Sequence, residues 1–592
     1  MRKLTRFPTG VGVVIASLVA GCGSFDDAAP ASSDKGGSDP GGGATGTGTG
    51  SAGSSGNAST SGGAGGGSRG PNTPPEVEVE KAFEAPVATA RYVWAANPKT
   101  GRVALIDSST FQVKTVAAGE GPTFIAAIPS ASPAGTQDRA IVLNVLSNDA
   151  TLLTQTDGKL EQKTIQVAPQ ANAWAISPDG KWAISWTDAA RVPKADKAQG
   201  FQKITVIDLR DTGAGVRGAP KTVGFRPKSI SFASDPPRAF AVTEDGIDAI
   251  ELPASETSTV KKLGFEPAPN WAEIDAGAGA LPDDAGATDD TGVREGGGAK
   301  TDVVPPGVVA SGAPDVSITP KGEFAIVSRA GSAVVTAVDL AKGTRASWIL
   351  PGPVTDLDLS DSGDRAVAVM RSLGRVAVLP IGIAGATGFS DVAIANEVVG
   401  SVVIAPRGKT AVLYTNATAI ERLTVLDLDK RSYRVVGLHA PVLSVFASPT
   451  TDYAIVVHNS FMGQAFQSPG AFSFVPLADD QSPVIQNTDA PVQSVAISQA
   501  GDRALIPVRD DPKHVYGVYL TRMPSGVVDR FPLASPPTAA GFVGASGLGF
   551  IAQEHPEGRV AFIDPQNGHV RTITGFELGA SVVEWSPRDG GQ

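Results

Sequence analysis

The 592-residue sequence contains only one cysteine and five histidines, and each scarcity excludes a kind of structure. A single thiol, Cys22, cannot form a disulfide within the chain, so the fold must be stabilised by its hydrophobic core. The histidines do not pair at the spacing of a metal-binding motif. They are His439, His458, His514, His555 and His569. The sequence therefore predicts no metal site and no cofactor.

Positive charge is also scarce. The chain has 49 Lys and Arg residues against 60 Asp and Glu residues, which gives a formal net charge of −11. Nucleic-acid binding requires a basic face, so a nucleic-acid partner is excluded. No nucleophile–base pair or phosphate-binding loop stands out either, and we predict no catalytic residue. A non-enzymatic role is therefore favoured.

The first residues have the pattern of a targeting signal. Three basic residues within the first six positions precede an apolar run at residues 11–20, which is too short to span a bilayer. The run ends in LVAGC, which resembles the lipobox of bacterial lipoproteins. The resemblance implies a signal peptide of residues 1–21, cleavage after Gly21 and a diacylglycerol on Cys22. The alternative is an ordinary secretory signal with a chance cysteine.

Two further expectations follow from a lipid on Cys22. The lipid would be the membrane anchor, and Gly23 at the next position favours the outer membrane, because Asp there retains enteric lipoproteins in the inner membrane. Residues 22–87 are dominated by Gly, Ser, Thr and Ala, which cannot bury enough apolar area to fold. We interpret them as a flexible tether, which at some 55 residues reaches about 40 Å on average.

From residue 88 to the end, one pattern of short strands and polar turns recurs. Ten copies of a strand-and-turn unit, such as NAWAISPDG, PDVSITPKG and GSVVIAPRG, begin between positions 122 and 579, a mean spacing of (579 − 122)/9, or about 51 residues. Three more strand-like runs separate successive copies. Four strands per repeat of this length are typical of β-propeller blades, rather than of a solenoid or serial sandwiches.

The predicted fold is therefore an all-β propeller of about ten units, in one large ring or with a second small ring. The region opens with what reads as a second strand, RYVWAANP, and closes with a lone first strand, ASVVEWSP. We expect these two segments to join in one blade built from both termini, which would remove exposed strand edges.

The stretch YVWAANPKTGRVALIDSSTFQVKTVAAGEGPTFIAAIP and the turn SPDGKWAISW resemble the YVTN-type and related lactonase-like bacterial propellers. The resemblance implies the fold and says little about chemistry. One function it raises is that of a lactonase-like hydrolase. Such an enzyme would need acidic or histidine side chains gathered at the axis on one face.

Three long insertions map to one face of the predicted propeller. In an antiparallel blade, loops joining second to third strands share a face with loops joining fourth to next first strands. The insertions span residues 188–201, 265–312 and 459–471. The acidic insertion at about 266–312 lacks the ordered ligand spacing of a calcium loop, so we interpret it as solvated chain.

This face is the predicted binding face, because loops carry function more often than the scaffold does. The candidate contact residues are Phe461, Met462, Phe466, Arg509, Asp510, Asp511 and His514. The expected protein is a lipid-anchored envelope binding or scaffold protein with an unidentified envelope or extracellular partner, protein or ligand. It would face the cell surface or the periplasm, and in the latter case it resembles the propeller lipoprotein of the outer-membrane barrel assembly machine. The alternative is the hydrolase.

Overall fold

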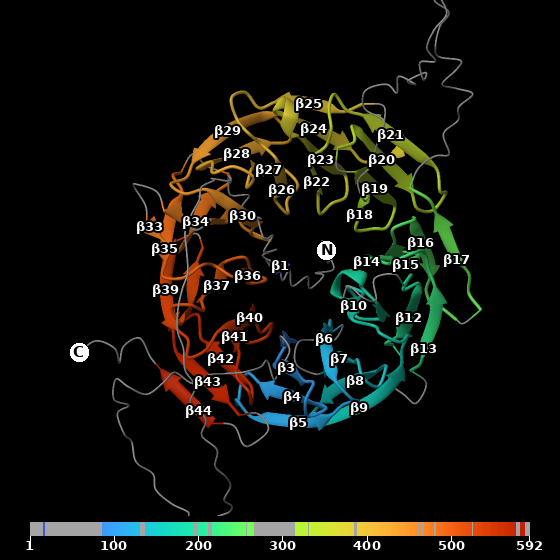
Figure 1. Ribbon diagram of the computed structural model, residues 1–592, viewed down its shortest axis with the longest axis vertical. Coiled ribbons are helices and arrows are strands. Elements are labelled where there is room, and N and C mark those ends of the chain that lie inside the picture. The colour runs from blue at the N-terminus through green and yellow to red at the C-terminus, as the bar shows by residue number, and fades with distance from the viewer. Residues whose placement is uncertain are drawn as a thin grey trace, which may run out of the picture. The chain divides into compact units, whose positions relative to one another are not determined.

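The computed structural model describes residues 16–17 and 86–585, with gaps at 131–136, 193–198, 211–215, 256, 266–313, 330, 384–387, 459–460, 463–466, 479–480, 524 and 576–580. The described chain is a β-propeller of ten antiparallel blades in a single ring (Figure 1). The all-β prediction is confirmed, and the ring is one large ring. The helical segments described are two short 3-10 turns, η1 (Ala189–Arg191) and η3 (Arg371–Leu373).

Blades 1 to 5 follow one another along the chain, each running from its innermost to its outermost strand. Blade 1 contains β2 (Val87–Ala88), β3 (Tyr92–Asn97), β4 (Arg102–Asp107) and β5 (Val113–Ala117). Blade 2 contains β6 (Pro122–Ile128), β7 (Gln137–Asn144), β8 (Asp149–Thr156) and β9 (Lys159–Gln166). Blade 3 contains β10 (Ala173–Ile176), β11 (Trp182–Trp186), β12 (Lys203–Asp208) and β13 (Gly218–Thr222). Blade 4 contains β14 (Ser229–Ser234), β15 (Pro237–Val242), β16 (Ile247–Glu251) and β17 (Val260–Leu263). Blade 5 contains β18 (Pro314–Ile318), β19 (Phe324–Arg329), β20 (Val334–Asp339) and β21 (Arg345–Ile349).

Blades 6 to 10 complete the ring. Blade 6 contains β22 (Asp356–Leu359), β23 (Arg365–Met370), β24 (Arg375–Pro380) and β25 (Ser390–Ala393). Blade 7 contains β26 (Ser401–Ile404), β27 (Thr410–Tyr414), β28 (Arg422–Asp427) and β29 (Ser432–Gly437). Blade 8 contains β30 (Val442–Ala447), β31 (Tyr453–His458), β34 (Gly470–Pro476) and β35 (Val484–Thr488), with the small ribbon β32 (Phe461–Met462) and β33 (Gln467–Ser468) between its second and third strands. Blade 9 contains β36 (Ser494–Ile497), β37 (Arg503–Asp510), β38 (Val515–Arg522) and β39 (Val527–Pro532). Blade 10 contains β40 (Pro537–Phe542), β41 (Gly549–Gln553), β42 (Arg559–Ile563), β43 (Val570–Thr574) and β44 (Ser581–Trp585).

The position of a strand within its blade determines how deeply it is buried and therefore which residues it contains. Middle strands are covered on both faces by neighbouring blades, so β11 reads Trp-Ala-Ile-Ser-Trp and is buried at every residue. The outermost strand β5 reads Val-Lys-Thr-Val-Ala and is half-buried at its valines and exposed elsewhere. Apolar clusters run continuously from each blade to the next, which is how a domain of this size is stabilised without a disulfide.

The prediction that one blade is built from both termini is wrong. The innermost strand of blade 1 is β2, which pairs with β3 through Val87 and Ala88. The C-terminal segment at Ser581–Trp585 is instead β44, a fifth strand that pairs antiparallel with β43 on the outside of blade 10 (Figure 1). The sequence did not reveal β2, because two residues are too few to show alternating apolar and polar positions. The β44 segment has the pattern of a first strand, so it was assigned to that place in blade 1.

The ring closes by packing between blades 1 and 10. Phe550 and Phe562 of blade 10 lie in one buried cluster with Val93 and Ile106 of blade 1, each at most 2% exposed. The backbone adds two hydrogen bonds across the same junction, from Gly544 N to the carbonyl of Thr89 at 3.3 Å and from Ala545 N to the carbonyl of Ala90 at 2.6 Å. Closure therefore depends on side-chain burial, not on a strand contributed by the other terminus.

In blades 3, 5, 6, 7, 9 and 10 the tight turn between the first and second strands carries a glycine with a positive φ. In blade 3 this is Gly180, with φ +67°. A Cβ atom there would lie 2.0 Å from the carbonyl oxygen of Pro129 in blade 2, so the turn fits closely against the preceding blade. The hydroxyl of Ser177 accepts hydrogen bonds from the backbone N–H groups of Lys181 and Trp182, at 3.1 and 2.9 Å, and fixes the turn from within.

Several sequence predictions lie outside the described residues. These are the lipidation site Cys22, most of the tether and the acidic insertion. The two-residue strand β1 (Ala16–Ser17) is described and pairs with β36, within the segment that we predict to be removed as a signal peptide. Among the residues described, no helix is long and apolar enough to cross a membrane.

Candidate functional site

The strand bounds place the three long insertions as the sequence predicted. They connect β11 to β12, β31 to β34 and β17 to β18, which are two second-to-third connections and one fourth-to-first connection. Because strands alternate in direction within each blade, these connections emerge on one side of the ring. We call this side the long-loop face, and the opposite side the short-turn face.

Arg509 is the centre of a charge network on the long-loop face. It lies near the end of β37, and its Nε donates to Asp511 Oδ1 at 2.7 Å and to Oδ2 at 2.9 Å. Its Nη1 donates to Glu554 Oε1 in blade 10 at 2.8 Å. Burial would lower the pKa of Arg509, but these bonds outweigh it and raise the pKa. The guanidinium therefore links two neighbouring blades by charge-assisted hydrogen bonds.

The other polar candidates in this loop have local partners. Asp510 accepts a salt bridge from Lys513 at 3.0 Å, and this bond lowers the pKa of the Asp510 carboxyl. His514 adopts φ +54°, and its Nδ1 lies 3.4 Å from the hydroxyl of Tyr516. Of these polar candidates, the structure brings together Arg509 and Asp511, and Arg509 also reaches Glu554 of the next blade. Sequence reasoning did not foresee that Arg509 would bridge Asp511 and Glu554.

The apolar candidates occupy the insertion of blade 8. Phe461 and Met462 form β32, which pairs antiparallel with β33. Phe466 lies outside the described residues. The roles of all three as partner contacts remain predictions.

His458, at the end of β31, has a structural role that the sequence did not reveal. It is buried, with Nε2 at 2.7 Å from Ser473 Oγ and Nδ1 at 3.2 Å from the carbonyl oxygen of Pro441. Burial lowers its pKa to about 4, so the imidazole is neutral near pH 7. Within the described residues, no three His, Cys, Asp or Glu side chains are placed to hold a metal ion.

Two carboxylates lie on the innermost strand of blade 6. Asp356 Oδ2 accepts from the backbone N–H of Val402 at 2.8 Å, and Asp358 Oδ2 accepts from that of Ile404 at 2.6 Å. Both N–H groups belong to β26, the inner edge strand of blade 7, whose outer side pairs with β27. The aspartates therefore satisfy an otherwise unpaired strand edge and join two blades near the axis.

The same burial that makes these hydrogen bonds strong disfavours the negative charge. Burial is the largest cause of the raised pKa of Asp358, and the nearby charges of Asp356 and Asp361 raise it further. A carboxyl whose folded pKa lies above its ordinary value of 3.8 destabilises the fold when ionised, and this cost disappears as the pH falls through the folded pKa.

We expect Asp358→Asn and Asp358→Ala to separate these two effects. The alanine leaves the N–H of Ile404 without its acceptor, at a cost of about 1–3 kcal/mol. The asparagine keeps an acceptor and carries no charge, so it should be the more stable of the two variants. Because wild type alone carries the ionised group, stability relative to Asp358→Asn should fall as the pH rises from 4 to 7. Urea unfolding across this range measures both differences, and a flat wild-type-minus-asparagine difference would contradict the charge argument.

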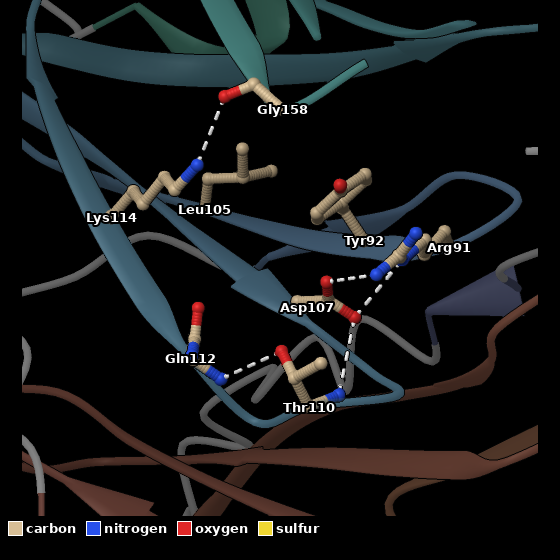
Figure 2. Close-up of a pocket in the computed structure, with 8 residues that line it drawn as sticks. All are labelled: Arg91, Tyr92, Leu105, Asp107, Thr110, Gln112, Lys114 and Gly158. Atoms are coloured by element: carbon tan, nitrogen blue, oxygen red, sulfur yellow. Dashed lines mark hydrogen bonds and ion pairs between the residues drawn. The ribbon is translucent and has the colours of Figure 1, made fainter. Parts of the chain in front are cut away.

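A pocket of about 220 Å³ lies between blades 1 and 2 on the short-turn face (Figure 2). Its walls are Arg91, Tyr92, Leu105, Asp107, Thr110, Gln112, Lys114 and Gly158. Sequence reasoning missed it, because its residues come from β3, β4, β5 and the β8–β9 turn and form no motif along the chain.

The Arg91–Asp107 pair is the fixed wall of this pocket. Arg91 donates to both carboxylate oxygens, from Nε at 3.1 Å and from Nη2 at 2.6 Å. Ser109 adds donors from N at 2.8 Å and Oγ at 2.6 Å, and Thr110 N adds one at 3.3 Å. Burial would raise the pKa of Asp107, but these five donors lower it to about 2. The carboxylate therefore stays ionised and saturated with donors.

Comparisons with known proteins find similarities among solved structures only. No protein-family model matches the chain, and no curated protein matches it. Among solved structures, the dihydro-heme d1 dehydrogenase NirN in complex with DHE is similar at 14% identity and a TM-score of 0.38, over 78% of this chain and 76% of that one. Apo AztD from Citrobacter koseri is similar at 12% identity and a TM-score of 0.37, over 67% of this chain and 94% of that one. Hydrazine synthase from Kuenenia stuttgartiensis is similar at 12% identity and a TM-score of 0.31, over 49% and 99%.

Proposed function

We propose that this chain is a lipid-anchored binding protein of the cell envelope, whose long-loop face captures a partner protein. The lipid would sit on Cys22, and the glycine-rich stretch after it would hold the ring away from the membrane. The anchor and the binding surface would lie at separate ends of a flexible segment. The ring could then reach a partner while the lipid stays in the outer membrane.

The observation that carries the proposal is the arrangement of blades 8, 9 and 10. Blade 8 carries the ribbon β32–β33 with Phe461 and Met462, and the adjacent blades 9 and 10 are joined on the same face by Arg509, Asp511 and Glu554. A protein-binding hot spot usually combines a few apolar anchors with fixed charges on the same face. The charges would orient the partner, and the apolar insertion would supply most of the affinity.

The test replaces Phe461, Met462 and Phe466 together with serine in the full-length chain. Capture of an envelope partner in a pull-down should fall at least tenfold, because each lost apolar anchor removes about 1 kcal/mol or more of binding free energy. The matched control is Lys181→Ala with Lys409→Ala, in turns of the short-turn face, which should leave capture unchanged. If the control variant abolished capture and the triple variant did not, the binding face would be the opposite one.

The anchor is tested separately with Cys22→Ser. The wild-type mature protein should begin at a diacylated Cys22, and the variant should carry no lipid, as mass spectrometry of the N-terminal peptide would reveal. Recovery of a cleaved wild-type protein without lipid would contradict the lipoprotein part of the proposal and leave the binding face untouched.

A further inference from the structure

We propose that the axial edge of β36, the innermost strand of blade 9, binds an extended, uncharged peptide by taking it as an additional strand. The edge faces the axis of the ring, so it is separate from the long-loop face, and the inference goes beyond binding at that face. It rests on one part of the proposed function only, the removal of residues 1–21 as a signal peptide.

In the full chain, this edge carries a strand from the chain's own first residues. Ala16 pairs antiparallel with Val495, and Ser17 pairs with Ser494. The sheet of blade 9 runs in the order β1-β36-β37-β38-β39, so β1 lies on the axial side of β36. Figure 1 shows β1 inside the ring, next to β36. The edge is therefore accessible from the axis and can accept a strand.

Removal of residues 1–21 would take β1 away and leave this edge without a strand partner. The backbone N–H and C=O groups of an unpaired strand edge are a ready template for another chain. In the other nine blades, the innermost described strand is the first of its sheet, and no described strand pairs on its axial side. Blade 9 is therefore the blade at which the described chain shows strand addition from the axis.

The axial edge of blade 7 is closed in a different way, which strand addition would have to undo. The backbone N–H groups of Val402 and Ile404 in β26 donate to Asp356 and Asp358 of blade 6. The innermost strands around blade 9 offer no such acid, because β36 reads Ser-Val-Ala-Ile and neither β30 nor β40 contains a charged residue. The edge of β36 is thus open to an added strand, and that of β26 is not.

The side chains around the edge of β36 select an uncharged peptide. Ala496 and Ile497 of β36 and Leu443 and Phe446 of β30 are half-buried apolar residues. A charged group placed beside them would lose water without gaining a partner. The strand that pairs there belongs to the run at residues 11–20, which contains only Val, Gly, Ile, Ala, Ser and Leu. The ligand class is therefore an extended stretch of small and branched uncharged residues, and main-chain hydrogen bonds supply its affinity.

The first test traps the peptide by a disulfide. The probe is a synthetic peptide with the sequence of residues 12–19, Ser17→Cys and two lysines at each end for solubility. The target is the mature protein with Ser494→Cys, purified in detergent. Because Ser17 and Ser494 are directly opposed, a peptide that adds in the same register brings the two thiols together. We expect a disulfide between them at a rate that saturates with peptide concentration, and mass spectrometry separates this product from any reaction at Cys22.

The matched control is Ser401→Cys in the mature protein. Ser401 is the half-exposed first residue of β26, as Ser494 is of β36, but the axial edge of β26 is closed by carboxylates. Trapping at residue 401 should be at least tenfold slower than at residue 494. An unchanged melting temperature for both variants establishes that they fold.

The second test asks whether the backbone of the peptide makes the contact. Two fluorescent peptides of the same sequence, with Ser17 retained, carry methyl groups on the amide nitrogens of either Ala16 and Leu18 or Ile15 and Ser17. Successive N–H groups of a strand point to opposite sides, so only one of these sets can face β36. One peptide should therefore bind the wild-type mature protein at least tenfold more weakly than the other, as fluorescence anisotropy would measure.

Equal trapping at residues 494 and 401, no trapping at residue 494 in a folded variant, or equal affinity of the two methylated peptides would overturn the proposal. The anisotropy measurement uses the wild-type protein, so it decides the question even where a cysteine variant does not fold. A mature protein that kept residues 1–21 would also overturn it, because β1 would retain the edge. A cleaved protein without lipid would contradict the proposed anchor and leave this inference intact.

Discussion

Phe562→Ala is expected to lower the free energy of unfolding by about 3–5 kcal/mol, the cost of emptying a fully buried phenylalanine site. Phe562 is 1% exposed and meets the ring of Phe111 in blade 1 edge-on, with centroids 5.4 Å apart. The substitution therefore removes an aromatic contact across the junction that closes the ring. Urea unfolding of the full-length chain, followed by tryptophan fluorescence, measures the loss.

Deleting residues 581–592 is the control for this prediction. If closure depends on packing between blades 1 and 10, the deletion removes only the outer edge strand β44 and should cost clearly less than Phe562→Ala. If the C-terminal strand instead completed blade 1, the deletion would be the more damaging of the two changes. The order of the two effects therefore decides how the ring closes.

Gly180→Ala is expected to destabilise the protein by about 2–5 kcal/mol, from about 1–2 for a left-handed backbone and about 1–3 for overpacking. The second contribution arises because the new Cβ would lie 2.0 Å from the carbonyl oxygen of Pro129. Gly180 also contacts the preceding blade through Arg139 of β7, whose Nη2 donates to the Gly180 carbonyl at 3.2 Å. Thermal or urea unfolding gives the loss.

Gly526→Ala separates the two contributions. Gly526 has nearly the same φ, +68°, and nothing lies within 4 Å of its Cβ position. Its substitution should therefore cost only the backbone part, about 1–2 kcal/mol. Equal losses at the two glycines would mean that the turn of blade 3 does not press on blade 2, contrary to the structure.

The fold could be predicted from the sequence because the same pattern of strands and turns recurs in every repeat. Each copy shows alternating apolar and polar residues, a polar turn and a second strand. A strand that is unclear in one copy can therefore be recognised from the other copies. The exception was the first strand of blade 1, where Val87 and Ala88 are too few to show alternation. The repeat count of ten was nevertheless right, because the missed β2 was replaced by the extra β44.

The contacts between blades could not be predicted in the same way. The bridge from Arg509 to Glu554 spans 45 positions, and the bond from Asp358 to Ile404 spans 46. Such pairs depend on which residues face each other once the blades stand side by side, and this depends on the register of every strand. The pocket around Leu105 could not be predicted for the same reason, because Gly158 of blade 2 lies beside residues of blade 1 only in the folded ring.

Because the ring closes by packing between blades, the number of blades can change during evolution by gain or loss of whole repeats. Apart from the two-residue strand β1, which pairs with β36 of blade 9, the described strands of every blade come from one continuous stretch of sequence. Duplication or loss of a single repeat therefore adds or removes a complete wedge, and the new neighbours meet through the same kind of apolar surface as the old ones. A ring assembled in this way can grow to ten blades by duplication of repeats. No strand from one end of the chain has to pair with the other end after each duplication.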